Sequence, residues 1–335
     1  MVTGKLFYLR KEAADIKVLV TGGAGFIGSH IVDVLLQFGY QPVIIDNLST
    51  GDIKNIPQGV PFYCEDINSE NLKEIFLIEK PTFVIHQAAQ VDIQTSQKNP
   101  THDAKVNILG LLNVLECSVR HQVKKFVFAS SAAVYGNPDY LAIDESHPLR
   151  PQSAYGISKS VASMYLELFA KLYGLEYVVL RYSNVYGPRQ GLKGEGGLIP
   201  SLIVRLFKQE APIIYGDGSQ TRDFIYVKDV ASANLRALEI KTNNILNIST
   251  NTQSTVLAVS EMLMRILNTW VEPIFKEGRS GEILHSCLDN KRARETLLWE
   301  PNCSLESGLT ETVKYYRKLG RLEEIEKPID CGRTG

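Results

Sequence analysis

The stretch TGGAGFIGSH, residues 21–30, decides the fold of this chain. It follows an apolar run, IKVLVT at 16–21, and opens an amphipathic segment of helical length. Gly22, Gly25 and Gly28 form the spacing G-x-x-G-x-x-G, which allows a tight turn, close approach of the backbone to a pyrophosphate and close packing of a helix. The N–H groups and partial positive charge at a helix N-terminus also favour phosphate. The stretch therefore predicts a strand, a phosphate-binding turn and a helix, as in a dinucleotide site.

An acidic residue follows at the position that such a site requires. Asp46 ends the apolar run PVIID at 42–46, 18 residues after Gly28. A carboxylate there can accept a hydrogen bond from an adenosine ribose and would repel a 2′-phosphate. The spacing therefore predicts NAD, rather than NADP, as the cofactor.

The first half of the chain alternates between short apolar runs and longer amphipathic segments. Further apolar runs lie at 60–64, 82–89, 125–131, 177–183 and 245–249, and helix-length segments lie at 27–38, 104–121, 153–173, 198–209 and 227–240. Continuous apolar strands that alternate with helices are typical of a parallel sheet covered on both faces. With right-handed crossovers, this pattern predicts an α/β fold with a Rossmann-type doubly wound parallel sheet.

The alternation between apolar runs and amphipathic segments is interrupted after Ser183. Residues 186–226 are rich in Gly and Pro and are expected to form loops around one helix, and residues from 251 to about 320 read as a small mixed region. We therefore expect an NAD-binding domain of residues 1–185 with 227–250. A smaller mixed α/β region, residues 186–226 with 251–335, would cap it and hold the substrate.

Composition excludes several classes of function. The chain has 36 Lys and Arg against 37 Asp and Glu, which argues against a general binder of nucleic acid or acidic membrane. No apolar run is long enough for a secretory signal or a membrane helix. The five cysteines are scattered without C-x-x-C, and the six histidines show no metal-ligand spacing. We expect a cytoplasmic protein with reduced thiols and no metal site.

A tyrosine and a lysine one helical turn apart suggest the chemistry. Tyr155 and Lys159 occupy positions i and i+4 of YGISK, so they share one helix face. A phenol with a pKa near ~10 is a poor base at pH 7, but a nearby ammonium and a positive nicotinamide ring would favour the phenolate. Ser131 ends the apolar run at 125–131, where ligands collect in open α/β sheets. The three residues therefore predict a site of hydride and proton transfer.

Together these motifs resemble the extended short-chain dehydrogenase/reductase family, and most closely its nucleotide-sugar 4-epimerases of the UDP-glucose 4-epimerase type. The resemblance covers residues 16 to about 318. Besides the glycine loop, its landmarks are DNLSTG (46–51), EDI (65–67), HQAAQV (86–91), NILG (107–110), SSAAVYG (130–136), YGISK (155–159), RYSNVYGPRQ (181–190), GDGSQTRDFIYVKD (216–229) and GEILHSCLDNKRARETLLWEP (281–301).

The resemblance implies roles for individual residues. The cofactor would be bound by the glycine loop with Phe26 and Ile27, by Asp46 and Asn47 at the adenosine ribose, by Asp66 and Ile67 beside the adenine, and by Ala88, Ala89, Asn107, Tyr155 and Lys159. Ser131, Tyr155 and Lys159 would be catalytic. The UDP-sugar would be bound by Ser131, Tyr155, Asn184, Arg222, Arg279, Glu282 and Ser286, with the two arginines on the diphosphate and Glu282 on the uridine ribose.

The residues after Ser131 distinguish between related reactions. Dehydratases and decarboxylases of this family carry an acid there, because elimination needs a proton donor for the leaving hydroxyl. Here Ala132 and Ala133 follow. The expected reaction is therefore a 4-epimerisation, in which Tyr155 takes the C4 hydroxyl proton, a 4-keto sugar turns over in the site, and hydride returns to the opposite face.

The substrate and the assembly stay open at this level. The resemblance places Ser286 at a gate beside C2 of the sugar, where a small residue leaves room for an N-acetyl group, so UDP-glucose and UDP-galactose as well as their N-acetylated counterparts are expected. A uronic-acid substrate, a net dehydrogenase and a catalytically inactive NAD-binding sensor remain alternatives. A homodimer through 104–121 and 153–173 is also expected, although the apolar residues at helical spacing there fit a core equally well (Leu109, Leu112, Leu115, Leu166 and Phe169).

Overall fold

The computed structural model describes residues 15–191, 197–278 and 283–319. Its centre is a seven-stranded sheet in the order β3-β2-β1-β4-β5-β6-β11, and every pair in it is parallel. The predicted doubly wound sheet is thus confirmed. The strands are β1 (Lys17–Thr21), β2 (Gln41–Ile45), β3 (Phe62–Tyr63), β4 (Phe83–His86), β5 (Lys125–Ser131), β6 (Glu176–Tyr182) and β11 (Asn244–Ile248).

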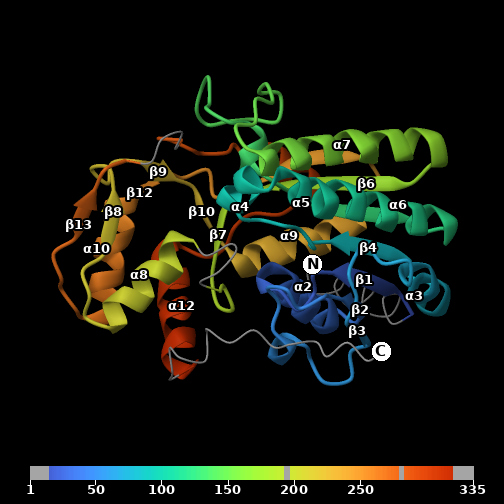
Figure 1. Ribbon diagram of the computed structural model, residues 1–335, viewed down its shortest axis with the longest axis horizontal. Coiled ribbons are helices and arrows are strands. Elements are labelled where there is room, and N and C mark those ends of the chain that lie inside the picture. Colours follow the sequence, from blue (N-terminus) through green and yellow to red (C-terminus); the bar gives the residue numbers. More distant parts are fainter. Residues whose placement is uncertain (1–14, 192–196, 279–282, 320–335) are drawn as a thin grey trace.

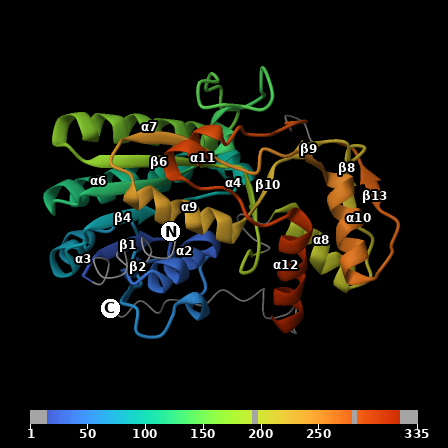
Figure 2. The ribbon, with the colours of Figure 1, turned by 180° about the vertical axis from the view of Figure 1, so that it is seen from behind.

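Helices cover both faces of the sheet, because the strands present apolar side chains to each face in turn. Val18 and Val20 of β1 join one buried cluster, and Leu19 between them joins the other. Figures 1 and 2 show the resulting three layers. One face packs against α2 (Phe26–Gln37) and α9 (Val227–Glu239), and the other against α3 (Leu72–Glu79), α6 (Leu111–Arg120) and α7 (Ala154–Tyr173).

The segment expected as one helix at 104–121 is divided. It comprises the end of α5 (Pro100–Ala104), a π-helical turn η2 (Lys105–Gly110) and α6. Such turns are rare and occur frequently at functional sites. A further short helix, α4 (Ile93–Lys98), precedes α5, and 3-10 turns η1 (Ile53–Asn55) and η3 (Ala132–Val134) complete this half.

The predicted loops at 186–226 contain short strands that the Gly and Pro content concealed. β7 (Asn184–Tyr186) pairs with β10 (Phe224–Tyr226), β8 (Ile213–Tyr215) with β13 (Ile274–Lys276), and β9 (Thr221–Arg222) with β12 (Ser254–Thr255). With α8 (Leu198–Phe207), α10 (Val256–Leu267) and α12 (Leu305–Leu319) they form a group beside one end of the sheet (Figure 1), which we call the cap. α11 (Lys291–Leu297) instead contacts β11 and α9. The predicted domain boundaries stay a prediction.

Burial decides whether the apolar residues at helical spacing in 104–121 and 153–173 belong to the core or to an outward face. Leu115, Leu166 and Phe169 belong to the core beneath α6 and α7, so they do not form an outward face. Leu109 is exposed, and Leu112 is half-buried. Among the described residues, no helix is long and apolar enough to cross a membrane.

Candidate active site

The glycine loop leaves no room for side chains where it turns. Gly22 has a φ of +70°, and a Cβ there would lie 2.7 Å from the backbone nitrogen of Ala88. A Cβ on Gly28 would collide with the carbonyl of Gly22, so the first turn of α2 lies directly against the loop. Gly25, the N-cap of α2, has no side chain to accept from the helix N–H groups. The loop therefore fits a pyrophosphate, as the sequence predicts.

Asp46 holds this loop as well as facing the expected ribose position. Its carboxylate is buried and accepts hydrogen bonds from the backbone nitrogens of Ala24 (3.0 Å) and Leu48 (2.8 Å). Burial raises the pKa of Asp46, and these backbone hydrogen bonds oppose that shift. Since a carboxylate can accept about four hydrogen bonds, it retains capacity for a ribose hydroxyl.

The expected adenine site lies along the next strand end. Asn47 Nδ2 donates to Asp66 Oδ2 at 2.8 Å, so the two residues assigned to the adenosine are joined. Burial works against ionisation of Asp66, but hydrogen bonds from Asn68 and Asn47 hold its pKa below the usual range. Ile67 is buried in the core and packs closely on Gly110 of η2.

The loop after β4 is fixed by Asn107. Ala88 donates its backbone N–H to the Thr21 carbonyl at 3.1 Å, which places it and its neighbour Ala89 beside the glycine loop. Asn107 is buried within η2; its Oδ1 accepts from the Gln90 nitrogen at 2.8 Å and its Nδ2 donates to Asp103 Oδ1 at 3.0 Å. The π-helical turn therefore presents an amide that holds the loop in place.

The predicted catalytic residues come from two neighbouring elements, β5 and α7. Ser153 begins α7 by accepting from the Gly156 nitrogen at 3.0 Å, which sets Tyr155 in the first turn. Lys159 is buried and donates to the Ala129 carbonyl at 2.8 Å. Its Nζ lies 5.8 Å from the centroid of the Tyr155 ring. Lys159 and Tyr155 therefore lie beside one another near the end of β5.

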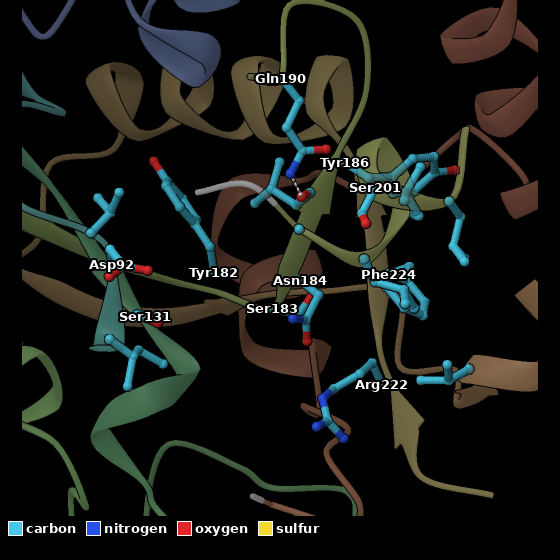
Figure 3. Close-up of a pocket in the computed structure, with 18 of the residues that line it drawn as sticks. Asp92, Ser131, Tyr182, Ser183, Asn184, Tyr186, Gln190, Ser201, Arg222 and Phe224 are labelled. Carbon is cyan, nitrogen blue, oxygen red and sulfur yellow. Dashed lines mark hydrogen bonds between the residues drawn. The ribbon is translucent and has the colours of Figure 1, made fainter. Parts of the chain in front are cut away.

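A cavity of about 660 Å³ extends from Ser131 and Tyr155 to the cap. Ser131, Tyr155, Asn184 and Arg222 line it, and Figure 3 shows Ser131 on one side and Arg222 on the other, with Asn184 between them. Four residues predicted to contact the sugar nucleotide thus share one cavity.

Several lining residues were not predicted from the sequence. Ser130 is buried, and its Oγ has no hydrogen-bond partner among the described residues, so it is available to a bound group. Asp92 and Gln94 reach the cavity from the start of α4. Ser130 opens the motif SSAAVYG (130–136) and could have been found there. The turn into α4 carries no sequence signal that separates residues lining the cavity from residues exposed to solvent.

The cap end is built around Arg222 and its neighbour. Arg222 Nη1 donates to the Thr221 carbonyl at 2.9 Å. Asp223 is buried and accepts from the Thr250 nitrogen (2.9 Å), the Asn251 nitrogen (3.0 Å) and Ser183 Oγ (3.3 Å). This carboxylate therefore joins the strands beside the cavity to the loop after β11.

Three of the residues predicted to bind the substrate are not among the described residues that line the cavity. Ser286 donates its N–H to the Thr221 carbonyl at 3.2 Å, so it lies beside β9, but it is not among the described lining residues. Arg279 and Glu282 lie outside the described residues.

The described residues contain no group of three or more His, Cys, Asp or Glu side chains that could hold a metal ion.

Residues 18–249 match the model of the NAD dependent epimerase/dehydratase family. The chain belongs to this family. A protein of Methanocaldococcus jannaschii is 46% identical over 305 residues, which is 91% of this chain and 99% of that protein.

Solved structures agree with the family. The UDP-glucose 4-epimerase of Thermotoga maritima, determined with UDP-glucose, is 44% identical with a TM-score of 0.89, covering 91% of this chain and 100% of that one. The UDP-glucose 4-epimerase of Thermus thermophilus, in complex with NAD, is 38% identical with a TM-score of 0.86, covering 90% and 99%. The UDP-N-acetylglucosamine 4-epimerase of Methanobrevibacter ruminantium, in complex with UDP-N-acetylmuramic acid, is 35% identical with a TM-score of 0.87, covering 91% and 99%.

Proposed function

We propose that this protein is an NAD-dependent UDP-hexose 4-epimerase. The observation that carries the proposal is the shared cavity, which has Ser131 and Tyr155 at one end and Arg222 at the other. A guanidinium suits a diphosphate, so the sugar of a nucleotide-sugar would lie at the end with Ser131 and Tyr155, and its diphosphate at Arg222. The full-length similarity to UDP-glucose 4-epimerases supports the same substrate class.

The residues present fit NAD. The tight glycine loop would hold its pyrophosphate, Asp46 its adenosine ribose, and Lys159 and the buried hydroxyl of Ser130 the nicotinamide end. When bound there, NAD supplies a reversible hydride acceptor at the sugar C4. Tyr155 would take the C4 hydroxyl proton and later return it, and Ser131 would hydrogen-bond the same oxygen.

The two residues that follow Ser131 carry no acid, which favours epimerisation over elimination. Ala132 and Ala133 form the 3-10 turn η3, and the Ala133 nitrogen donates to Ser131 Oγ at 3.2 Å. This turn offers no side chain that could protonate a leaving hydroxyl. UDP-glucose and UDP-galactose are the proposed substrates. The small residue at Ser286 and the similarity to a UDP-N-acetylglucosamine 4-epimerase support the N-acetylated pair as well.

The outer face of α7 supports a homodimer, which we propose as the working form in the cytoplasm. Ile157, Met164, Leu168 and Leu172 recur at helical spacing and are exposed, Met164 by 65%, and exposed Leu109 lies on η2. An apolar stripe of this kind is typical of an interface between copies. Replacing Met164 with Glu should convert a dimer into monomers in light scattering, whereas a monomeric wild type would refute the proposal.

The reaction is tested by NMR. Purified protein given UDP-galactose should form UDP-glucose until both are present at equilibrium, and denaturation should release NAD. An inactive protein that still releases NAD would favour the sensor alternative. Accumulation of NADH with substrate would indicate a net dehydrogenase instead.

A further inference from the structure

The end of the cavity that holds the catalytic serine also carries a carboxylate. Asp92 lines the cavity together with Ser131 and Tyr155, and Figure 3 shows it on the same side as Ser131. Arg222 lies on the other side. Among the described residues that line the cavity, Asp92 carries the one carboxylate and Arg222 the one positively charged side chain. The cavity is therefore polarised, with its positive charge at the expected diphosphate end.

Hydrogen bonds hold Asp92 in place. Its Oδ1 accepts from the Thr95 nitrogen at 2.6 Å and so caps α4. Its backbone nitrogen donates to Gln90 Oε1 at 2.7 Å, and its carbonyl accepts from Gln90 Nε2 at 3.1 Å. Gln90 also donates to the buried Asp103 at 3.0 Å. The carboxylate cannot turn away from the cavity without losing the helix cap.

We propose that Asp92 sets the charge specificity of the sugar site, accepting hydrogen bonds from the hydroxyls of a neutral hexose and excluding UDP-uronates. This inference rests on the proposed 4-epimerase function. The sugar C4 must reach Ser131 and Tyr155 and must present both of its faces, so the C5 substituent visits more than one wall of the sugar end. A C6 carboxylate there faces Asp92 without a described lining cation to offset it, and juxtaposed like charges disfavour binding strongly.

The acid that Asp92 would exclude is one at C6 of the sugar. UDP-N-acetylmuramic acid, the ligand in the Methanobrevibacter ruminantium structure, carries its carboxylate on the C3 side chain and keeps a neutral hydroxymethyl group at C6. A uronate instead carries its charge on the substituent of C5, so the acid lies on the opposite side of C4 from that C3 side chain.

The test is a ratio of specificity constants. Wild type should show a kcat/KM for UDP-glucose at least about 100-fold above that for UDP-glucuronate. Asp92→Asn keeps a helix-capping side chain and removes the charge, so it should narrow this ratio about 10-fold or more. Asp139→Asn, which removes an exposed carboxylate paired with Arg150 and outside the cavity wall, should leave the ratio unchanged.

Calorimetric binding of both nucleotide-sugars separates this inference from the reaction itself. A shift of relative affinity towards UDP-glucuronate in Asp92→Asn, even in a protein that epimerises neither sugar, would support the charge role and overturn only the reaction. Equal use and equal binding of the two sugars by wild type, or an unchanged ratio in Asp92→Asn, would overturn the role of Asp92.

Discussion

The cofactor half and the cap of this molecule hold their ligand-facing residues by different means. In the cofactor half, the glycine loop, Asp46 and Ser131 lie at the carboxyl ends of parallel strands, and strand pairing aligns those ends: Thr21 lies opposite both Ile45 and His86. In the cap, Arg222 lies in a two-residue strand. Its neighbour Asp223 accepts hydrogen bonds from the backbone nitrogens of Thr250 and Leu288, which are distant in sequence. A regular sheet positions residues by register, whereas the cap positions them by individual polar contacts.

The largest expected effect lies on the catalytic tyrosine of the cofactor half. Tyr155→Phe removes the hydroxyl that transfers the proton, and general acid–base catalysis is worth ~10²–10⁴-fold. We expect kcat to fall by about that factor while NAD content and the affinity for UDP-glucose change little. A variant that retained a tenth or more of wild-type kcat would show that another group moves the proton.

The next effect tests the close packing of the glycine loop. Gly22 and Gly174 have nearly the same φ, +70° and +71°, but a Cβ meets Ala88 at the first and has nothing within 4 Å at the second. Gly174→Ala should therefore cost only the left-handed strain, about 1–2 kcal/mol of unfolding free energy. Gly22→Ala should cost more and lose NAD on purification. Equal Tm values and equal NAD content would contradict the packing argument.

A smaller effect is expected at the cap, where one arginine contributes binding without chemistry. Arg222→Lys keeps the charge but loses the planar pair of donors, so we expect KM for UDP-glucose to rise about 10-fold with kcat nearly unchanged. Arg294→Ala, which breaks an exposed ion pair with Glu300, is the control and should leave KM unchanged. A loss confined to kcat would place Arg222 at the reacting centre instead.

A further expected effect is a pH dependence of stability. Burial, with a lesser contribution from Lys159, lowers the pKa of His86 to about 3, and burial lowers that of His30 to about 4. The unfolded chain binds these protons near pH ~6.5, so stability is fully present above that value and falls as the pH decreases through it. Each histidine should contribute a slope of up to ~1.4 kcal/mol per pH unit.

Single variants would assign that slope. His86→Gln tests the cofactor half, and His30→Gln tests the contact between α2 and the Pro188 carbonyl, at 2.9 Å. Each should flatten the loss of unfolding free energy between about pH 6 and about pH 4.5, measured by denaturant titration. Exposed His102 is the control. An unchanged slope in both variants would mean that other groups govern acid unfolding.

Sequence alone predicted the cofactor half well because its signals are local. Periodicity located the strands, and the glycine spacing located the turn beside Ala88. The helix at 104–121 was predicted as continuous because its π-helical turn keeps a helical apolar pattern. Leu166 and Met164 show the limit of such patterns, since both lie on α7 but only the first is buried, at 1% against 65% exposure.

The cap was harder to predict for a physical reason. Its strands are two or three residues long, too short for a visible alternation, and their partners are separated by as many as about 60 residues. Asp92 was missed because Gln90, which fixes the turn at Asp92, is itself held by Asp103 and Asn107, 13 and 17 residues further along the chain. Residues held by distant contacts leave no local pattern to read.

In the proposed reaction, Tyr155, Ser131 and Lys159 assist as the C4–H bond of one bound sugar is broken and formed again within a single cavity. The most direct test is epimerisation of UDP-galactose in D₂O, followed by NMR. The UDP-glucose formed should keep protium at C4, because that hydrogen leaves and returns without exchange with solvent. Deuterium at C4 of the product would contradict it.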